Sequence, residues 1–271
     1  MRGSPYTDLD RPPLSASSLR RALVTPGGLW TDLAVVPETG STNADVAAAG
    51  RAGAAEGLVL VAERQTAGRG RLDRRWESPP RAGLALSVLL RPRTTVSRYG
   101  WLPLLAGVAL VETVRRLGEV DAVLKWPNDL LIGERKCAGI LAESVGDAVV
   151  LGIGLNVTLR EPELPVPVAT SLLLAGSACT DRDPLLRALL RNLADWYLRW
   201  RDTSGDPETS GLREAYRVHC ATLGRQIRVA LPDGTGLTGT ASDVDGTGRL
   251  VVTGPDGATT PLAAGDIDHV R

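Results

Sequence analysis

The stretch AVLKWPNDLLIGERKCAGILAESVGDAVVLGIGLNV, residues 122 to 157, carries the strongest fold signal of the chain. It contains four apolar runs, AVLKW, DLLI, CAGILAESV and AVVLGIGLNV, separated by short turn segments such as GERK. Apolar runs of this length, bounded by Gly, Pro, Asn and Asp, are typical of buried strands joined by tight turns. The stretch therefore predicts a sheet that contains hairpins.

The segments on either side of this stretch predict further strands and helices. Two more buried-strand runs precede it, GLVLVAE at 57–63 and AGLALSVLL at 82–90. Helical spacing of apolar residues follows a capping Ser41 or Thr42 and recurs at 102–118, 184–201 and 211–220. We expect an α/β (α+β) fold in which a mixed β-sheet is flanked by helices.

Composition divides the chain into three expected parts. Residues 1–25 are rich in Pro, Ser and Arg and predict a tail with at most one short helix. Residues 26–221 hold the strands and helices of the main domain. From 222 to 271 the sequence changes to short β runs separated by PDG and DGTG, which is typical of a small separate β-barrel.

Charge, hydropathy and cysteine usage limit the function classes. The 271 residues contain 31 Lys+Arg and 31 Asp+Glu, so no overall positive field favours nucleic acid. The longest apolar run, residues 101–111, is about half a membrane span, and the N-terminus lacks the apolar core of a signal peptide. Cys137, Cys179 and Cys220 form no CxxC pair. We expect a reduced, cytoplasmic protein without a structural zinc site and without membrane or DNA partners.

The rarest side chains mark a candidate site. Only Lys125 and Lys136 are lysines, so the other 29 of the 31 basic residues are arginine. Asn occurs four times and Gln twice. Six of these eight residues fall in five short segments, STNAD, QTAGRG, KWPND, RKCAGIL and GIGLN. Turn and capping needs would explain single cases, but the set as a whole indicates chemistry that arginine and alanine cannot supply.

The segment GRGRLDRRW, residues 68–76, indicates an anionic ligand. Four arginines alternate with or follow Gly68 and Gly70, and the segment lies between two expected buried strands. Glycines allow the backbone to approach a ligand, and clustered guanidinium groups favour phosphate. Solvated arginines or an RG-type nucleic-acid segment are the alternatives. Trp76 offers a flat face to a purine, or else packs on the core.

In this order and with this spacing, the motifs GSTN, QTAGRGR, KWPND, RKCAGIL and GIGLN resemble the catalytic domain of the biotin protein ligase family. The resemblance covers residues 30 to 271. It implies a mixed-sheet α/β domain followed by an SH3-like barrel. It also implies that biotin is activated with ATP and Mg²⁺ as biotinyl-5'-AMP. The biotinyl group would then pass to a lysine of the biotin carboxyl carrier protein domain of an acyl-CoA or pyruvate carboxylase.

The resemblance also assigns roles to single residues. It implies ligand binding by Ser41, Thr42, Asn43 and Gln65 on the biotin side, and by Gly68, Arg69, Gly70, Arg71, Trp76, Asn128, Lys136, Gly139 and Asn156 around the carboxyl group and the nucleotide. It implies catalytic roles for Lys136, Arg71 and Lys125. No metal ligand is assigned, because Asp129 fits either magnesium or a turn cap. Asp73 stands where the family loop has glycine, which predicts a stiffer loop.

Other functions fit the sequence less well. A lipoate or other acyl-adenylate ligase shares the fold and the reaction, but we expect its motifs to differ. A biotin-sensing repressor needs a DNA-binding domain, and fewer than about 30 residues precede the catalytic segment, which is short for a winged helix. A module that only binds ligand would not require two lysines and several arginines together.

Overall fold

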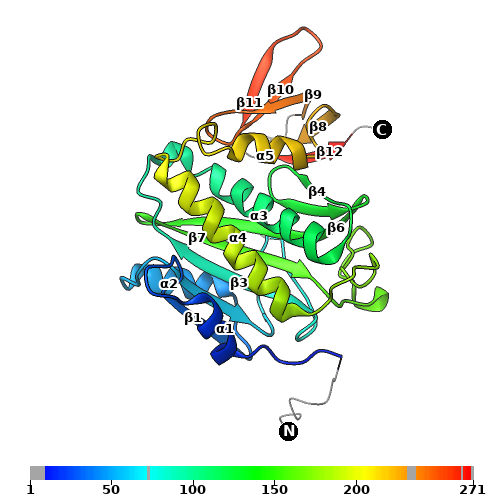
Figure 1. The fold of residues 1–271 in the computed structure, drawn as a ribbon. Helices are drawn as coiled ribbons and strands as arrows, with labels where there is room; N and C mark the ends of the chain where they lie inside the picture. The colour runs from blue at the N-terminus through cyan, green and yellow to red at the C-terminus, as the bar shows by residue number, and fades with distance from the viewer. Residues whose placement is uncertain (1–9, 72–73, 231–235, 264, 270–271) are drawn as a thin grey trace.

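The computed structural model of the protein describes residues 10–71, 74–230, 236–263 and 265–269 (Figure 1). Within these ranges a seven-stranded sheet forms the larger part and has the order β1-β2-β3-β7-β6-β5-β4. Its strands are β1 (Asp32–Val36), β2 (Leu58–Ala62), β3 (Gly83–Leu90), β4 (Ala122–Lys125), β5 (Asp129–Ile132), β6 (Arg135–Val145) and β7 (Ala148–Asn156).

The mixed character of this sheet comes from its first pair of strands. β1 and β2 are parallel, and α2 (Thr42–Arg51) connects them. Every other neighbouring pair is antiparallel, and β4 to β7 follow one another as hairpins. The predicted mixed sheet with hairpins is therefore confirmed, although the sequence reading omitted β1.

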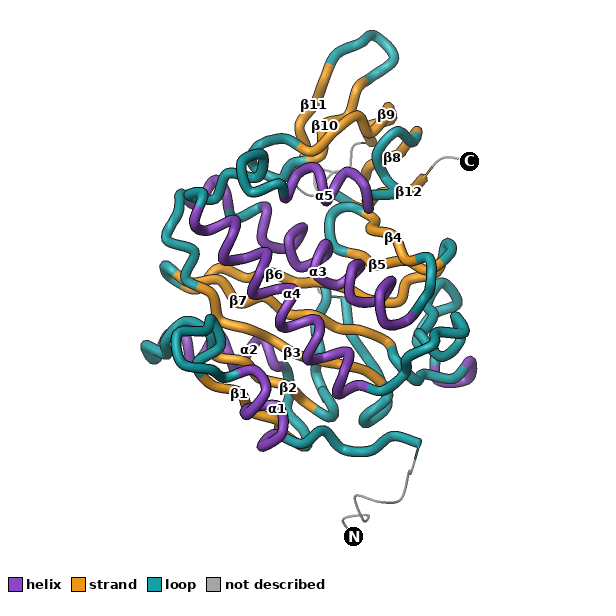
Figure 2. Tube along the Cα trace, in the orientation of Figure 1, coloured by secondary structure: helices purple, strands orange, loops and turns teal. Residues whose placement is uncertain are grey.

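Helices cover the two faces of the sheet unequally. α1 (Ala16–Leu23), α3 (Trp101–Gly118) and α4 (Arg182–Asp202) lie on the face turned to the viewer in Figures 1 and 2, and α2 lies on the opposite face. α5 (Leu212–His219) follows α4, and two short 3-10 turns cover Val96–Arg98 and Glu161–Glu163. One side of the sheet is thus fully covered and the other only partly.

The alternation of side chains along β7 explains which part of the sheet face beside α2 no helix covers. Val149, Leu151, Ile153 and Leu155 belong to the main core, together with α3 and α4. On the other face, Ala148 and Val150 pack against Val46 and Ala47 of α2. Because strand side chains alternate between faces, the next positions on the α2 side are Gly152, Gly154 and Asn156. These offer little apolar surface to a helix, and the functional cavity lies above them.

The N-terminal segment differs from the expected tail from residue 11 onward. Arg11 is 5% exposed and its guanidinium pairs with Glu163 at 2.6 Å. The short expected helix is present as α1, whose Leu19 and Leu23 are buried in the main core. Burial of these leucines makes 11–25 part of the larger domain. Residues 1–9 lie outside the described residues.

The C-terminal part is a small antiparallel domain, as the sequence predicted. Its strands, in the order β11-β10-β9-β8-β12, are β8 (Gln226–Ala230), β9 (Gly236–Val244), β10 (Leu250–Thr253), β11 (Thr259–Leu262) and β12 (Asp266–His269). The turn between β9 and β10 docks on the larger domain. There Arg98 donates to Gly246 O at 2.7 Å and the indole N–H of Trp126 donates to Gly248 O at 3.3 Å.

Candidate functional site

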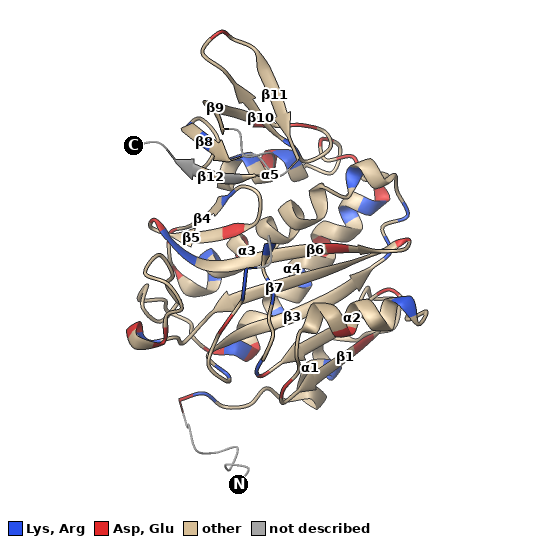
Figure 3. Ribbon diagram, turned by 180° about the vertical axis from the view of Figure 1, so that it is seen from behind, with Lys and Arg blue, Asp and Glu red and all other residues tan. Residues whose placement is uncertain are grey.

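A cavity of about 1150 Å³ lies on the sheet face that α2 leaves uncovered. Seen from that side, the β2–β3 connection with its Arg positions crosses in front of β6 and β7 (Figure 3). All sequence-predicted site residues except Gly68 line this cavity. They are Ser41, Thr42, Asn43, Gln65, Arg69, Gly70, Arg71, Trp76, Lys125, Asn128, Lys136, Gly139 and Asn156.

One end of the cavity is built on the first turn of α2. Ser41 is the N-cap and its Oγ accepts from Ala44 N at 3.5 Å. Oε1 of Gln65 accepts from the backbone N–H of Thr42 at 2.8 Å. Helix N-termini carry unpaired N–H groups that side-chain oxygens satisfy. The cap therefore fixes these hydroxyl and amide groups at the cavity wall.

Ser87 of β3 links this turn to the sheet, and the sequence reading missed it. Its Oγ lies 2.7 Å from Oγ1 of Thr42 and 2.6 Å from Oδ1 of Asn43, and the residue is fully buried. A buried hydroxyl must find hydrogen-bond partners, so a single serine inside the apolar run AGLALSVLL was the available signal. Asn43 also donates from Nδ2 to Glu143 at 2.6 Å.

Glycines form the floor of the cavity. A β-carbon at Gly152 would lie 2.1 Å from Oδ1 of Asn43, and one at Gly154 would lie 2.4 Å from the Trp76 ring. A β-carbon at Gly139 would also approach the ring, at 3.3 Å. Contacts under 3.0 Å are sterically forbidden, so Asn43 and Trp76 can occupy these places only above bare backbone. The motif GIGLN is explained by this requirement.

The arginine segment forms a hairpin. Gly70 N donates to Arg74 O at 2.6 Å, and Trp76 N donates to Gly68 O at 2.9 Å. A β-carbon at Gly68 would lie 2.4 Å from Trp76 O, so Gly68 shapes the hairpin and does not line the cavity. Its assignment as a ligand-binding residue stays a prediction. Asp73 lies outside the described residues, and its effect on the loop stays a prediction.

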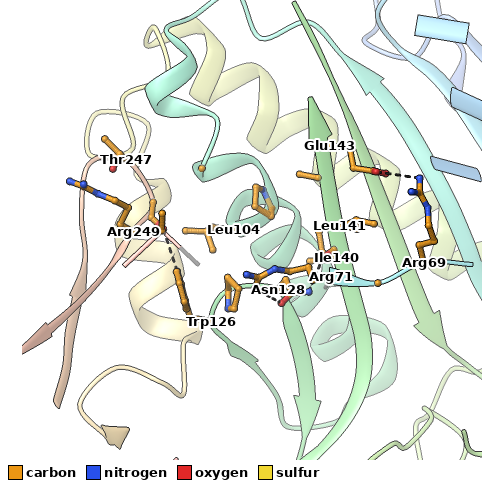
Figure 4. Close-up of a pocket in the computed structure, with 17 residues that line it drawn as sticks. Arg69, Arg71, Leu104, Trp126, Asn128, Ile140, Leu141, Glu143, Thr247 and Arg249 are labelled. Carbon is orange, nitrogen blue, oxygen red and sulfur yellow. Dashed lines mark hydrogen bonds and ion pairs between the residues drawn. The ribbon is translucent and has the colours of Figure 1, made fainter. Parts of the chain in front are cut away.

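Two contacts hold the hairpin against the sheet (Figure 4). Arg69 pairs with Glu143 of β6 at 3.3 Å, and Arg71 donates to Oδ1 of Asn128 at 3.4 Å. Both arginines also line a second cavity of about 500 Å³, which reaches the start of α3 and the barrel residues Thr247–Arg249. The hairpin therefore lies between the two cavities, and the large cavity also reaches the barrel at Ala230, Gly265 and Ile267.

Lys136 faces the large cavity because β6 is irregular next to it. The β5–β6 register shifts so that Leu130 pairs with Ala138 and Leu131 with Lys136, which leaves Cys137 as the extra residue. Nζ of Lys136 lies 2.6 Å from Oδ1 of Asp129 and 6.0 Å from the Trp76 ring centroid. An ammonium group thus stands between a carboxylate and an aromatic face.

Three neighbours of Lys136 have different roles. Burial raises the pKa of Cys137 to about 12, so this thiol stays neutral and cannot act as a nucleophile. Lys125 ends β4, opposite Asp129 in the register. Asn156 is 3% exposed and donates to Thr170 O at 2.9 Å, so one of its amide hydrogens has a structural partner.

The described ranges offer no ready metal cage. Among their residues, no group of three or more His, Cys, Asp and Glu side chains is placed to hold a metal ion. Asp129, the carboxylate next to Lys136, is already paired with that ammonium. Within the same part of the chain, no helix has the length and apolar character that crossing a membrane requires.

Comparisons with known proteins agree with this geometry. The Biotin/lipoate A/B protein ligase family matches residues 38–158, and the Biotin protein ligase C terminal domain matches residues 222–270. A Mycobacterium tuberculosis protein named "Biotin--[acetyl-CoA-carboxylase] ligase" is 45% identical over 272 residues, which is 98% of this chain and 100% of that protein. The chain belongs to the biotin protein ligase family.

Solved structures of biotin protein ligases share the fold. The enzyme from Aquifex aeolicus in complex with biotin and ATP has a TM-score of 0.72 at 27% identity, covering 89% of this chain and 100% of that one. The enzyme from Leishmania major in complex with biotinyl-5-AMP has a TM-score of 0.57 at 25% identity, covering 86% and 99%. The resemblance inferred from five sequence motifs is confirmed.

Proposed function

We propose that this chain is an ATP-dependent ligase that converts biotin to biotinyl-5'-AMP and transfers the biotinyl group to a lysine of a biotin carboxyl carrier protein domain. One observation carries the proposal. A single cavity has neutral hydroxyl and amide groups at one end and lysine and arginine cations at the other. Biotin has the matching polarity, since its ring is a neutral urea and its tail ends in a carboxylate.

The neutral end fits the ureido ring. Ser41, Thr42, Asn43 and Gln65 together offer hydroxyl groups and amide groups, which supply both donors and acceptors. Their positions are fixed by the N-cap of α2 and by Ser87 rather than by free rotation. A preorganised set of this kind binds a rigid, uncharged ring without ordering side chains at the moment of binding.

The cationic end fits the first chemical step. A carboxylate oxygen of biotin attacks the α-phosphorus of ATP, the bond to the bridging oxygen breaks, and pyrophosphate leaves. Both reactants are anions, so their approach requires positive charge, and charge shifts onto pyrophosphate as it leaves. We assign Lys136, Arg71 and Lys125 to this task, with Asp129 holding the Lys136 ammonium in place.

The hairpin fits the second step. A neutral lysine amine of the acceptor attacks the acyl carbon of biotinyl-AMP, the acyl–oxygen bond breaks, and AMP leaves. Water would hydrolyse the same bond, so the intermediate must be covered until the acceptor arrives. Arg69 and Arg71 already tie the hairpin to β6 and to the β4–β5 turn, where it would cover a bound adenylate.

Magnesium fits this site as an ion held mainly by its phosphate ligands. Mg²⁺ usually keeps several waters and binds through substrate phosphates and one or two carboxylates. The single carboxylate beside Lys136 agrees with that pattern, and bound Mg²⁺ would supply further positive charge at the phosphates. Asp129 is the residue of this chain that would reach it.

A transfer assay tests the proposal. Purified chain is mixed with radiolabelled biotin, ATP, Mg²⁺ and a purified biotin carboxyl carrier domain, and the labelled carrier is quantified. We expect label only when ATP is present, and none when the acceptor lysine is replaced by alanine. Parallel reactions with lipoate distinguish the alternative substrate. Bound biotin without labelled carrier would show a binding protein and contradict the proposal.

The remaining partners follow from the same chemistry. We propose a carboxylase carrier domain as the acceptor, and neither DNA nor membrane as a partner. The zero formal net charge supports the absence of a nucleic-acid field. Cytoplasmic location is proposed because ATP and carrier domains meet there, and because all three cysteines are free thiols.

A further inference from the structure

Glu143 is an acid beside the arginine hairpin, and it lines the second cavity of about 500 Å³. It lies on β6 with 32% of its side chain exposed, and its two oxygens have different partners. Oε2 accepts from Nδ2 of Asn43 at 2.6 Å, and Oε1 pairs with Arg69 at 3.3 Å. Arg69, whose contact with Glu143 is drawn in Figure 4, belongs to the hairpin, and Asn43 belongs to the biotin end, so one carboxylate joins the two halves of the site.

The contact with Asn43 fixes the direction of an amide. A carboxylate only accepts hydrogen bonds, so the NH₂ group of Asn43 must point toward Glu143. The opposite end, Oδ1, then lies 2.6 Å from Ser87 and above Gly152. Glu143, together with Leu141 O, which also accepts from Nδ2 of Asn43 at 3.4 Å, thereby sets which side of the Asn43 amide donates and which accepts.

The contact with Arg69 holds the hairpin. The hairpin has internal backbone hydrogen bonds, but its position over the sheet depends on side chains that reach β6 and the β4–β5 turn. The contact of Arg69 with Glu143 pairs opposite charges, whereas the contact between Arg71 and Asn128 ends on a neutral amide. A charged tether is the stronger of the two kinds.

We propose that Glu143 is a positioning residue that couples the biotin end of the cavity to the hairpin. It orients Asn43 and holds Arg69 over the site before substrates bind. A continuous set of polar contacts then runs from Gln65 through Thr42, Ser87 and Asn43 to Glu143 and Arg69. The role rests on the proposed ligase function for its catalytic consequence, while the restraint on the hairpin does not depend on any activity.

Substitution by glutamine separates the two contacts. In Glu143→Gln an amide oxygen still accepts from Asn43, but the charge that attracts Arg69 is lost. Partly exposed ion pairs of this kind contribute modestly, so we expect a rise of roughly two- to fivefold in the KM for biotin, with kcat and melting temperature unchanged. Glu143→Ala also removes the shorter of the two hydrogen bonds from Asn43 Nδ2 and leaves only Leu141 O at 3.4 Å, so we expect a larger rise, roughly tenfold.

Trypsin cleavage gives a readout that needs no substrate. The hairpin contains Arg69, Arg71, Arg74 and Arg75, and a hairpin released from β6 is cut faster after these residues. We expect Glu143→Gln to be cut roughly two- to fivefold faster than the parent, and the difference to shrink at high salt. Glu38→Gln is the matched control, because Glu38 also pairs with an arginine, Arg64, at 3.0 Å, and lines neither the large cavity nor the second cavity.

The combined outcomes keep the two proposals apart. If the parent makes no biotinyl-AMP, the ligase function fails, and the cleavage rates still test Glu143. Equal cleavage of parent and Glu143→Gln would overturn the positioning role. So would a lowered melting temperature with unchanged KM, which indicates a merely structural residue. In an Arg69→Ala background, Glu143→Gln must have no further effect on cleavage, and an undiminished effect would also overturn the proposal.

Discussion

At the residue scale, Lys136 shows why one cation is not exchangeable for another in this chain. Arginine serves at almost every basic position, yet this site keeps a compact ammonium between Asp129 and the Trp76 ring. A guanidinium is wider, planar and carries its charge over three nitrogens. It cannot occupy the same place without displacing the carboxylate or the ring.

We therefore expect Lys136→Arg to fold normally and to form biotinyl-AMP on the order of 10²- to 10³-fold more slowly, as for loss of one transition-state donor. Biotin-dependent exchange of pyrophosphate into ATP measures this rate. Arg135→Lys is the neighbouring control, since Arg135 pairs with Glu161 instead and should tolerate the change. A Lys136→Arg rate close to that of the parent would remove the catalytic assignment.

At the element scale, β7 performs two tasks through its alternation. One face carries Val149, Leu151, Ile153 and Leu155 into the core, and the other carries Gly152 and Gly154 under the ligand cavity. The strand is held on both sides, by β3 and by β6, so its backbone cannot retreat from an added side chain. Any new atom on the cavity face must move the groups above it.

Gly154→Ala should consequently push Trp76 off the floor. The new β-carbon would lie 2.4 Å from the ring, and overpacking of this kind costs about 1–3 kcal/mol. We expect the KM for ATP to rise roughly tenfold and the loss of stability to lie at the low end of this range, because Trp76 can move toward solvent. Biotin-dependent pyrophosphate exchange at varied ATP concentrations measures this KM. Gly40→Ala is the control, since nothing lies within 4 Å of a β-carbon placed there. Equal KM values for ATP in the two variants would contradict the proposed contact between Gly154 and Trp76.

At the scale of the whole molecule, the barrel is attached to the larger domain through α5 and Trp126. Asp243 of β9 accepts from Arg213 and Arg217 of α5, at 2.8 Å in each case. Trp126 N donates to Thr222 Oγ1 at 3.1 Å, directly before the segment that carries Asn128 and Asp129. Movement of the barrel is therefore transmitted to the cavity wall.

The ion pairs at α5 predict a pH dependence. Hydrogen bonding from Arg217 lowers the pKa of Asp243 in the folded protein. A group with a lowered folded pKa contributes stability above its unfolded value of about 3.9, and this contribution is lost as pH falls through the folded pKa. We expect Asp243→Asn to lose about 1 kcal/mol of stability near neutral pH, and the difference from the parent to shrink as pH falls below about 4 and to vanish below the folded pKa of Asp243. Denaturant unfolding at a series of pH values measures the free energy of unfolding of both proteins. A difference between parent and variant that stays constant at all pH values would contradict the prediction.

Removal of the barrel tests its contribution to function. A chain ending at Ala221 loses Thr222 and uncovers Trp126, which is 1% exposed in the intact protein. We expect the seven-stranded sheet to remain folded and biotinyl-AMP formation to fall roughly tenfold, as for coupling through a packed interface. Circular dichroism checks the fold and pyrophosphate exchange the activity. Full activity in a folded truncated chain would show that the barrel is dispensable.

Much of the fold and site was predictable because the signals are local. The hairpins of β4 to β7, the N-cap of α2 and the helices α3 and α4 follow from apolar spacing and turn residues within a few positions of each other. The short strand β1 was missed, because a five-residue run without a hairpin partner gives a weak signal.

The sequence by itself determined the family and the sheet with its barrel, because motifs and periodicity are written in consecutive residues, and it named residues such as Asn43 and Lys136 that line the cavity. Only the tertiary structure decided that Gly68 supports the hairpin from outside the cavity, and that Glu143 contacts both Asn43 and Arg69. These partners are 100 and 74 residues from Glu143 along the chain. Such contacts depend on strand register and on which face of the sheet a side chain occupies, and a register shift of one residue reverses that face.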